Sequence, residues 1–146
     1  MKTLTIGFTQ KSAEHFFGLL QKHEVRRLLD VRLNNTSQLS GFAKKNDLIF
    51  FLRELCQVEY VHIPELAPAA SLLKAYQNKD MAWTEYGARF MDLLGQRQAE
   101  RMVDLDLFDV GCLLCSEHQP HYCHRRLVLE YLNQHWQSPL DIVHLT

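Results

Sequence analysis

The stretch VGCLLCSEHQPHYCHRR, residues 110–126, decides the fold class and also holds three of the chain's four cysteines and three of its eight histidines. Its first six residues are largely apolar, as in a strand of a parallel sheet that is covered on both faces. A polar loop follows, and after it apolar residues recur at helical spacing over residues 127–136. Strand, loop and helix in this order form the repeating unit of an α/β protein.

The same alternation runs outward through the chain. Further strands are predicted at Thr3–Phe8, Arg27–Val31, Tyr60–Ile63 and Ile142–Leu145. Helices are predicted after a Ser12 cap, along the stripe Leu48, Phe51, Leu52 and Leu55, around Leu72–Tyr76, and along Trp83–Leu94. We therefore expect a single α/β domain over residues 1–146, with about five mostly parallel strands and helices on both faces.

Composition narrows the function classes. Hydrophobic residues make up 47% of the chain and charged residues 23%, as in an ordinary globular protein. The formal net charge is −1, so no global basic field indicates nucleic-acid binding, although a local basic pocket stays open. There is no apolar run of membrane-spanning or signal-peptide type, and the four cysteines do not form the pattern of a secreted disulfide framework. These features predict a cytoplasmic protein with no membrane contact.

Polar side chains follow several of the predicted strands. Asp30 and Arg32 stand at the end of one strand, Cys115 and Glu117 at the end of another, and Arg125 lies near the start of the next helix. Ligands of open parallel sheets bind outside the carboxyl ends of the strands. The sequence therefore predicts a pocket at this edge of the sheet.

Four segments resemble the domain-of-unknown-function-488 family. They are TIGFT (5–9), LLDVR (28–32) with the serine-bearing loop that ends in GF (41–42), EYVHIPELAP (59–68), and LLCSE with CHRR (113–117 and 123–126). The resemblance spans nearly the whole chain and implies a small α/β protein of bacterial or archaeal type, with no activity attached. The family's signature positions carry over to Asp30, Arg32, Ser37, Cys115, Glu117, Cys123, His124 and Arg125. The chain departs from the family's pattern at Phe8-Thr9 and at Asn34-Asn35.

A metal site is one interpretation of the cysteine- and histidine-rich stretch. The candidate ligands are Cys112, Cys115, Cys123 and His124. Zinc favours four sulfur and nitrogen ligands, but Cys112 and Cys115 lie three apart on one strand and so face opposite sides. A smaller set of Cys115, Cys123 and His124, with Glu117 or His121, stays open. We expect no structural zinc and no cofactor.

A cysteine nucleophile is the second interpretation. A helix N-terminus and two arginines near Cys115 would lower its pKa, and Glu117 or His124 would serve as acid–base group. However, the loop after Cys115 contains no glycine, unlike the anion-binding loops of cysteine phosphatases. The alternatives are a buried Cys115 that packs as a small hydrophobe and a buried His124 that donates to a carbonyl or to Glu117.

An anion-binding pocket is the third interpretation. Arg125 lies at a helix start, where the macrodipole disfavours a cation, so it needs a carboxylate or a bound anion as partner. We expect Arg32 and Arg125 to bind the anion, with Asp30 and Ser37 beside them; the alternative is an internal salt-bridge lattice with Glu117.

Two function classes follow from this pocket. One is a hydrolase or transferase that acts on a phosphorylated substrate. The other is a binding or regulatory module for a nucleotide, another small anion or a nucleic-acid backbone. The residues serve both classes, and they leave the oligomeric state open.

Overall fold

The computed structural model describes residues 1–34, 41–116 and 123–146. Within them, five strands form one sheet in the order β3-β2-β4-β1-β5, and all neighbouring strands are parallel. The strands are β1 (Lys2–Gly7), β2 (Arg27–Asp30), β3 (Glu59–His62), β4 (Gly111–Cys115) and β5 (Asp141–Leu145). The predicted α/β class and the five predicted strands are confirmed, with bounds shifted by about one residue.

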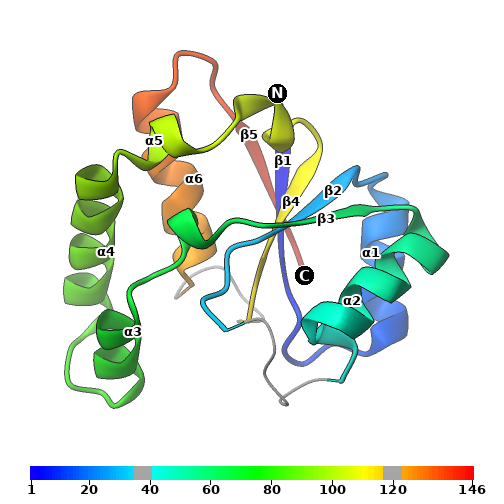
Figure 1. Cartoon of the computed structure of the whole chain (residues 1–146), viewed down its shortest axis with the longest axis horizontal. Helices are drawn as coiled ribbons and strands as arrows, with labels where there is room; N and C mark the ends of the chain where they lie inside the picture. Colours follow the sequence, from blue (N-terminus) through cyan, green and yellow to red (C-terminus); the bar gives the residue numbers. More distant parts are fainter. Residues whose placement is uncertain (35–40, 117–122) are drawn as a thin grey trace.

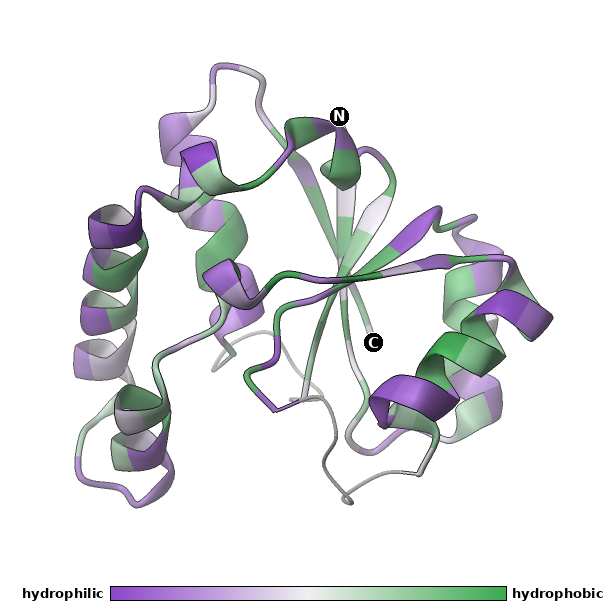
Figure 2. Ribbon diagram, viewed as in Figure 1, coloured by the Kyte–Doolittle hydropathy of each residue, from purple (hydrophilic) through white to green (hydrophobic). Residues whose placement is uncertain are grey.

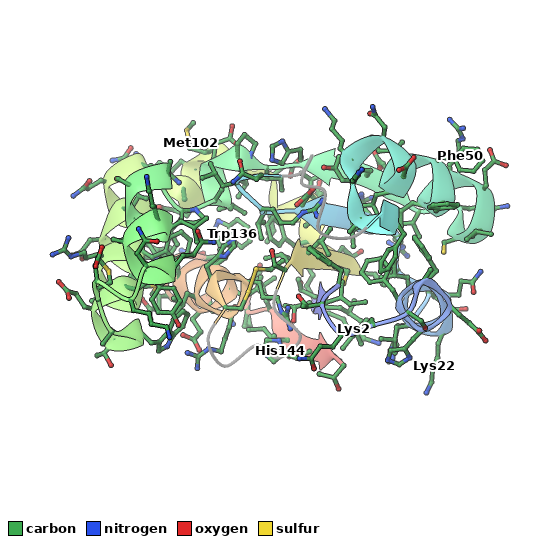
Figure 3. The ribbon with its side chains drawn as sticks, turned by 90° about the horizontal axis from the view of Figure 1, so that it is seen from below. Lys2, Lys22, Phe50, Met102, Trp136 and His144 are labelled. Carbon is green, nitrogen blue, oxygen red and sulfur yellow. A yellow bond between two sulfur atoms is a disulfide. The ribbon has the colours of Figure 1, made fainter. Side chains whose placement is uncertain are left out.

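Helices cover both faces of this sheet, as predicted (Figures 1 and 3). They are α1 (Ala13–Lys22), α2 (Lys45–Phe51), α3 (Ala70–Gln77), α4 (Trp83–Arg97), α5 (Ala99–Met102) and α6 (His124–His135). Short 3₁₀ turns occupy Gly41–Ala43, Pro64–Leu66 and Leu105–Phe108, and a π-helical turn occupies Leu52–Cys56. Figure 2 shows the hydrophobic side of α4 turned toward α6 and its hydrophilic side turned outward.

Alternating strand residues divide the core into two halves. Leu4, Ile6 and Leu114 pack with α1 and α2 on one face, whereas Leu113 packs with α4 and α6 on the other. Thr3, on β1, is fully buried, and its hydroxyl donates to the Phe108 carbonyl at 2.8 Å. A buried hydroxyl needs such a partner, so β1 tolerates a polar side chain in its interior.

The strand order creates a switch point beside β4. The chain after β1 and β2 leads to α1 and α2 on one face of the sheet. Between these two strands lies β4, but the chain after it leads to α6 on the opposite face. Connections that diverge to opposite faces leave a crevice at the carboxyl ends of the strands, which is where open α/β sheets bind ligands.

Two local predictions had different outcomes. The Ser12 side chain accepts a hydrogen bond from the His15 backbone N–H at 3.1 Å, which confirms the cap of α1. The predicted stripe from Leu48 to Leu55 is wrong at its end, because Leu55 is 52% exposed. The helix widens into the π-helical turn there, and a wider turn rotates Leu55 away from the sheet. No helix in the described part of the chain is both long and apolar enough to cross a membrane.

Candidate functional site

A cavity of about 560 Å³ opens at the carboxyl edge of the sheet. Its floor comes from the three segments that follow β1, β2 and β4, and one wall comes from the region of α3 and α4. In Figure 1 the segments that follow β1 and β2 run to the lower part of the view, and Figure 3 is seen from that side. The lining includes Phe8, Lys11, Arg32, Pro68, Leu73, Tyr76, Tyr86, Cys115, Cys123 and His124.

Arg32 is held in place by a buried carboxylate. Its Nε and Nη2 donate to the two carboxylate oxygens of Asp30, each at 2.9 Å, and its backbone N–H donates to the same group at 3.1 Å. The Tyr60 hydroxyl donates to Asp30 at 2.5 Å, and the guanidinium carbon lies 5.3 Å from the centre of the Phe8 ring. Asp30 is fully buried and serves as an anchor, while Arg32 lines the cavity.

His124, the first residue of α6, has a defined tautomer. Its Nε2 lies 2.7 Å from the Val31 carbonyl oxygen, which can only accept, so Nε2 carries the hydrogen. Nδ1 is then an acceptor, and it lies 3.4 Å from Cys115 Sγ. Burial lowers the pKa of His124 to about 4, and the Arg125 charge contributes, although the Val31 hydrogen bond and Asp30 raise it. The imidazole is therefore neutral at physiological pH.

Cys115 and Cys123 are joined by a disulfide. Cys115 ends β4 and Cys123 immediately precedes α6, so the bond ties a strand end to a helix start. Cys112 packs on the opposite face of the sheet, as its spacing from Cys115 predicted, and burial raises the pKa of its thiol. One donor atom from each of Cys115, Cys123 and His124 lies within 4.8 Å of the others, so these residues can hold a metal ion only after the disulfide is reduced.

Buried positive charge surrounds this cluster. Lys11 is only 8% exposed and lines the cavity, whereas Arg125 is fully buried and lies behind the lining. Burial lowers the pKa of Lys11, and the positive charge of Arg125 lowers it further.

Aromatic residues of α3 and α4 form one wall of the cavity. The rings of Tyr76 on α3 and Tyr86 on α4 stack at a centroid distance of 4.6 Å. Burial, with a smaller contribution from Tyr76, raises the pKa of Tyr86, so its hydroxyl stays protonated. Pro68 and Leu73 extend the same wall. The cavity is therefore cationic at the sheet and aromatic at the helices.

The structure brings several predicted site residues together. Arg32, Cys115 and His124 line one cavity, while Asp30 and Arg125 lie buried beneath it. The His124 hydrogen bond to a backbone carbonyl confirms one of the predicted alternatives for that residue. The predictions for Ser37 and Glu117 lie outside the described residues.

Other residues of the cavity were not predicted as site residues. Lys11 follows the end of β1, and the carboxyl ends of parallel strands share one edge, so its position was the signal that could have found it. Tyr76 and Tyr86 lie in two of the predicted helices, and Tyr86 is 2% exposed while also lining the cavity. Nothing in the sequence distinguishes a core tyrosine from one that borders a pocket.

The comparisons with known proteins bear on family only. No curated protein and no solved structure matches the chain. The family described as domain of unknown function DUF488 matches residues 12–132, which include β2, β3, β4 and most of α6. The chain therefore belongs to the DUF488 family.

Proposed function

We propose that the cavity binds a small ligand that combines a phosphate-like anion with a flat apolar group, as a nucleotide does. The observation that carries the proposal is the division of one cavity into a cationic floor and an aromatic wall. Ligand pockets of this kind are mostly apolar, with a few polar groups that orient the ligand.

The cationic floor suits an anion. The buried charged side chains of the described residues are Lys11, Arg32 and Arg125, which are cationic, and Asp30, which is anionic. Lys11 and Arg32 line the cavity, and the N–H groups of cationic side chains form strong hydrogen bonds to the oxygens of an anion. Arg32 is held rigidly by Asp30, and a fixed guanidinium loses little conformational entropy when it binds an oxyanion.

The aromatic wall suits a planar ring. Tyr76 is partly exposed and stacks on Tyr86, so its ring stands at the border of the cavity. Aromatic side chains stack on nucleobases irrespective of base identity, which makes a nucleotide a better fit than a sugar phosphate.

A hydrolase or transferase activity on a phosphorylated substrate is the second candidate function. It is favoured by the 3.4 Å approach of Cys115 Sγ to the His124 Nδ1 acceptor inside the same cavity. In the reduced protein Nδ1 can accept a hydrogen bond from the Cys115 thiol, which is the contact between nucleophile and base that such an activity needs. The acid–base role of Glu117 remains a prediction from the sequence. A non-catalytic binding or regulatory module is the alternative.

Calorimetric titration tests the binding proposal. A nucleoside monophosphate, its nucleoside and inorganic phosphate are compared on the reduced protein, with a short oligonucleotide as a further arm. The Lys11→Gln variant should weaken binding of the nucleotide about tenfold or more, since a charged hydrogen-bond partner contributes roughly 1.5–3 kcal/mol. Lys22→Gln, on the exposed end of α1, is the matched control and should bind as the wild type does.

Each outcome decides between the candidates. No heat and no thermal stabilisation with any of these anions would refute the proposed pocket. Preference for the oligonucleotide would favour the nucleic-acid backbone as ligand. If the nucleotide is consumed, and consumption is lost in Cys115→Ser but kept in Cys56→Ser, the protein is an enzyme.

A further inference from the structure

We propose that Cys115, Cys123 and His124 bind a thiophilic divalent cation such as Zn²⁺ when the two cysteines are reduced, with a fourth coordination position open to the cavity. This inference goes beyond the proposed function and does not depend on it. It also replaces the expectation of no metal, which was drawn mainly from the impossibility of a four-residue set that included Cys112.

The donor atoms are arranged as a metal requires. Cys115 Sγ and His124 Nδ1 are 3.4 Å apart, and all three donors lie within 4.8 Å of one another. With Zn–S near 2.3 Å and Zn–N near 2.0 Å, ligand atoms of a tetrahedral site lie roughly 3.5 Å apart. The separation between Cys115 and His124 therefore needs no change, whereas the two sulfur atoms must move apart after reduction.

The outer contacts of His124 also suit a ligand. Nε2 donates to the Val31 carbonyl at 2.7 Å, which directs the lone pair of Nδ1 toward Cys115. Histidines that bind metals usually donate their other ring N–H to a carbonyl or carboxylate, because this bond orients the ring. The ring is further positioned by an edge contact with Phe90 at 5.5 Å.

Disulfide formation and metal binding exclude each other. Two molecules of a low-molecular-weight thiol would reduce the Cys115–Cys123 bond, giving two protein thiols and one disulfide of the added thiol. Binding of the cation then releases two protons to solvent, and the two thiolates neutralise the charge of the dication.

Three protein ligands leave one position open. Structural zinc sites are closed by four protein ligands, whereas catalytic sites use three and keep a position for water or substrate. All three residues proposed here line the cavity, so the open position faces the space where a ligand would enter. An anionic group bound there can coordinate the cation directly.

Cobalt(II) titration tests the site without any organic ligand. The full-length protein is treated with a chelator, reduced and titrated anaerobically with Co²⁺. One equivalent per chain should produce the thiolate-to-cobalt charge-transfer absorption and the strong visible bands of tetrahedral cobalt, and Zn²⁺ should displace it. Both signals should be lost in Cys115→Ser and Cys123→Ser and shifted or weakened in His124→Asn, but kept in Cys56→Ser.

A second measurement covers the case in which a variant fails to fold. In wild-type protein, Zn²⁺ should protect two thiols from an alkylating reagent, and mass spectrometry should assign them to Cys115 and Cys123. Absence of the charge-transfer band in the reduced wild type, or protection of neither cysteine, would overturn the site. The cobalt titration contains no nucleotide and no phosphate, so a failure of nucleotide binding would not be mistaken for a failure of the metal site.

Discussion

Arg32 and Asp30 form a bidentate ion pair in which both partners are almost completely buried, with two hydrogen bonds of 2.9 Å. The two residues are separated by one position at the end of β2, so the pair fixes the direction in which the chain leaves the sheet. The sequence predicted a carboxylate or an anion as the partner of Arg32, and the carboxylate is confirmed. The pair supports the cavity floor from below.

Removal of the Asp30 carboxylate should destabilise the protein strongly. Asp30→Ala leaves the Arg32 guanidinium buried without this partner, and breaking a buried pair typically costs about 3–5 kcal/mol. The free energy of unfolding in urea measures the loss. Glu85→Ala is the matched control, because it breaks an exposed pair with Arg89 and should cost less than about 1 kcal/mol. Equal effects of the two substitutions would contradict the anchoring role of Asp30.

A methyl group at Gly111 should also be poorly tolerated. A Cβ there would overlap the Leu107 carbonyl oxygen, which is backbone and cannot turn aside, and it would approach the Phe108 Cα within 3.3 Å. Gly111→Ala should therefore cost several kcal/mol of unfolding free energy, at the upper end of single substitutions.

Gly95 provides the opposite case. It lies within α4, and a Cβ there meets nothing within 4 Å. Gly95→Ala should stabilise the protein by roughly 0.5–1 kcal/mol, because alanine loses less conformational entropy in a helix. If Gly111→Ala and Gly95→Ala unfolded at the same urea concentration, this result would contradict the close contact of Gly111 with Leu107 and Phe108.

The contact between Tyr131 and Glu100 should make stability depend on pH. The Tyr131 hydroxyl donates to the Glu100 carboxylate at 2.6 Å, and this bond is the main cause that lowers the pKa of Glu100. A carboxylate whose pKa is lower in the folded state stabilises above its unfolded pKa, and this contribution is lost as the pH falls through the folded value. Tyr131→Phe should therefore reduce stability at neutral pH more than at acidic pH.

Urea unfolding of both proteins at neutral pH and near pH 3 measures this difference. A gap between wild type and Tyr131→Phe that is constant with pH would mean that Glu100 is not the group responsible. His135→Gln is a useful companion, because the His135 charge also lowers the pKa of Glu100, but by less.

Thiol counting should distinguish the four cysteines. Without reductant, the unfolded protein should react with two equivalents of alkylating reagent, at Cys56 and Cys112, and after reduction with four. In the native protein Cys56 should react first, because it is partly exposed whereas Cys112 is fully buried. Rapid native alkylation of Cys112 would contradict its place in the core.

Local patterns in the sequence predicted most of the fold. Apolar runs that are covered on both faces, such as residues 111–115, read as strands because burial in a parallel sheet demands such composition. The strand assignments also predicted that Asp30 and Arg32 lie at the site, since the carboxyl ends of parallel strands share one edge of the sheet. Leu55 was misplaced because the extra residue in its turn breaks the helical period.

The remaining parts of the site depend on contacts between distant segments. The position of β4 between β1 and β2 is set by pairing of residues about 80 to 110 positions apart, which no local pattern encodes. The aromatic wall depends on how α3 packs against α4, and the disulfide depends on the approach of a strand end to a helix start. A connectivity of this kind cannot be derived from cysteine spacing alone.

The aromatic wall gives the most specific prediction for ligand binding. Tyr76→Leu should weaken binding of a nucleoside monophosphate by about 1–3 kcal/mol, the usual contribution of one base stacked on an aromatic side chain. Inorganic phosphate should bind the variant as it binds the wild type, because the cationic floor is unchanged. Tyr76→Phe keeps the ring and its stacking on Tyr86, and should restore nucleotide binding.

Lys11→Gln completes the comparison from the other side of the cavity. It should weaken the binding of phosphate and of the nucleotide alike. Any binding of the free nucleoside should stay unchanged, since the nucleoside carries no negative charge to pair with Lys11. Calorimetry of the nucleoside monophosphate, the nucleoside and inorganic phosphate on Tyr76→Leu and Lys11→Gln therefore measures the contributions of the aromatic wall and the cationic floor separately. Tyr76→Leu could instead weaken the binding of inorganic phosphate as much as the binding of the nucleotide. In that case the aromatic wall would act by shaping the cavity and not by stacking on a base, and the ligand would be a simple anion.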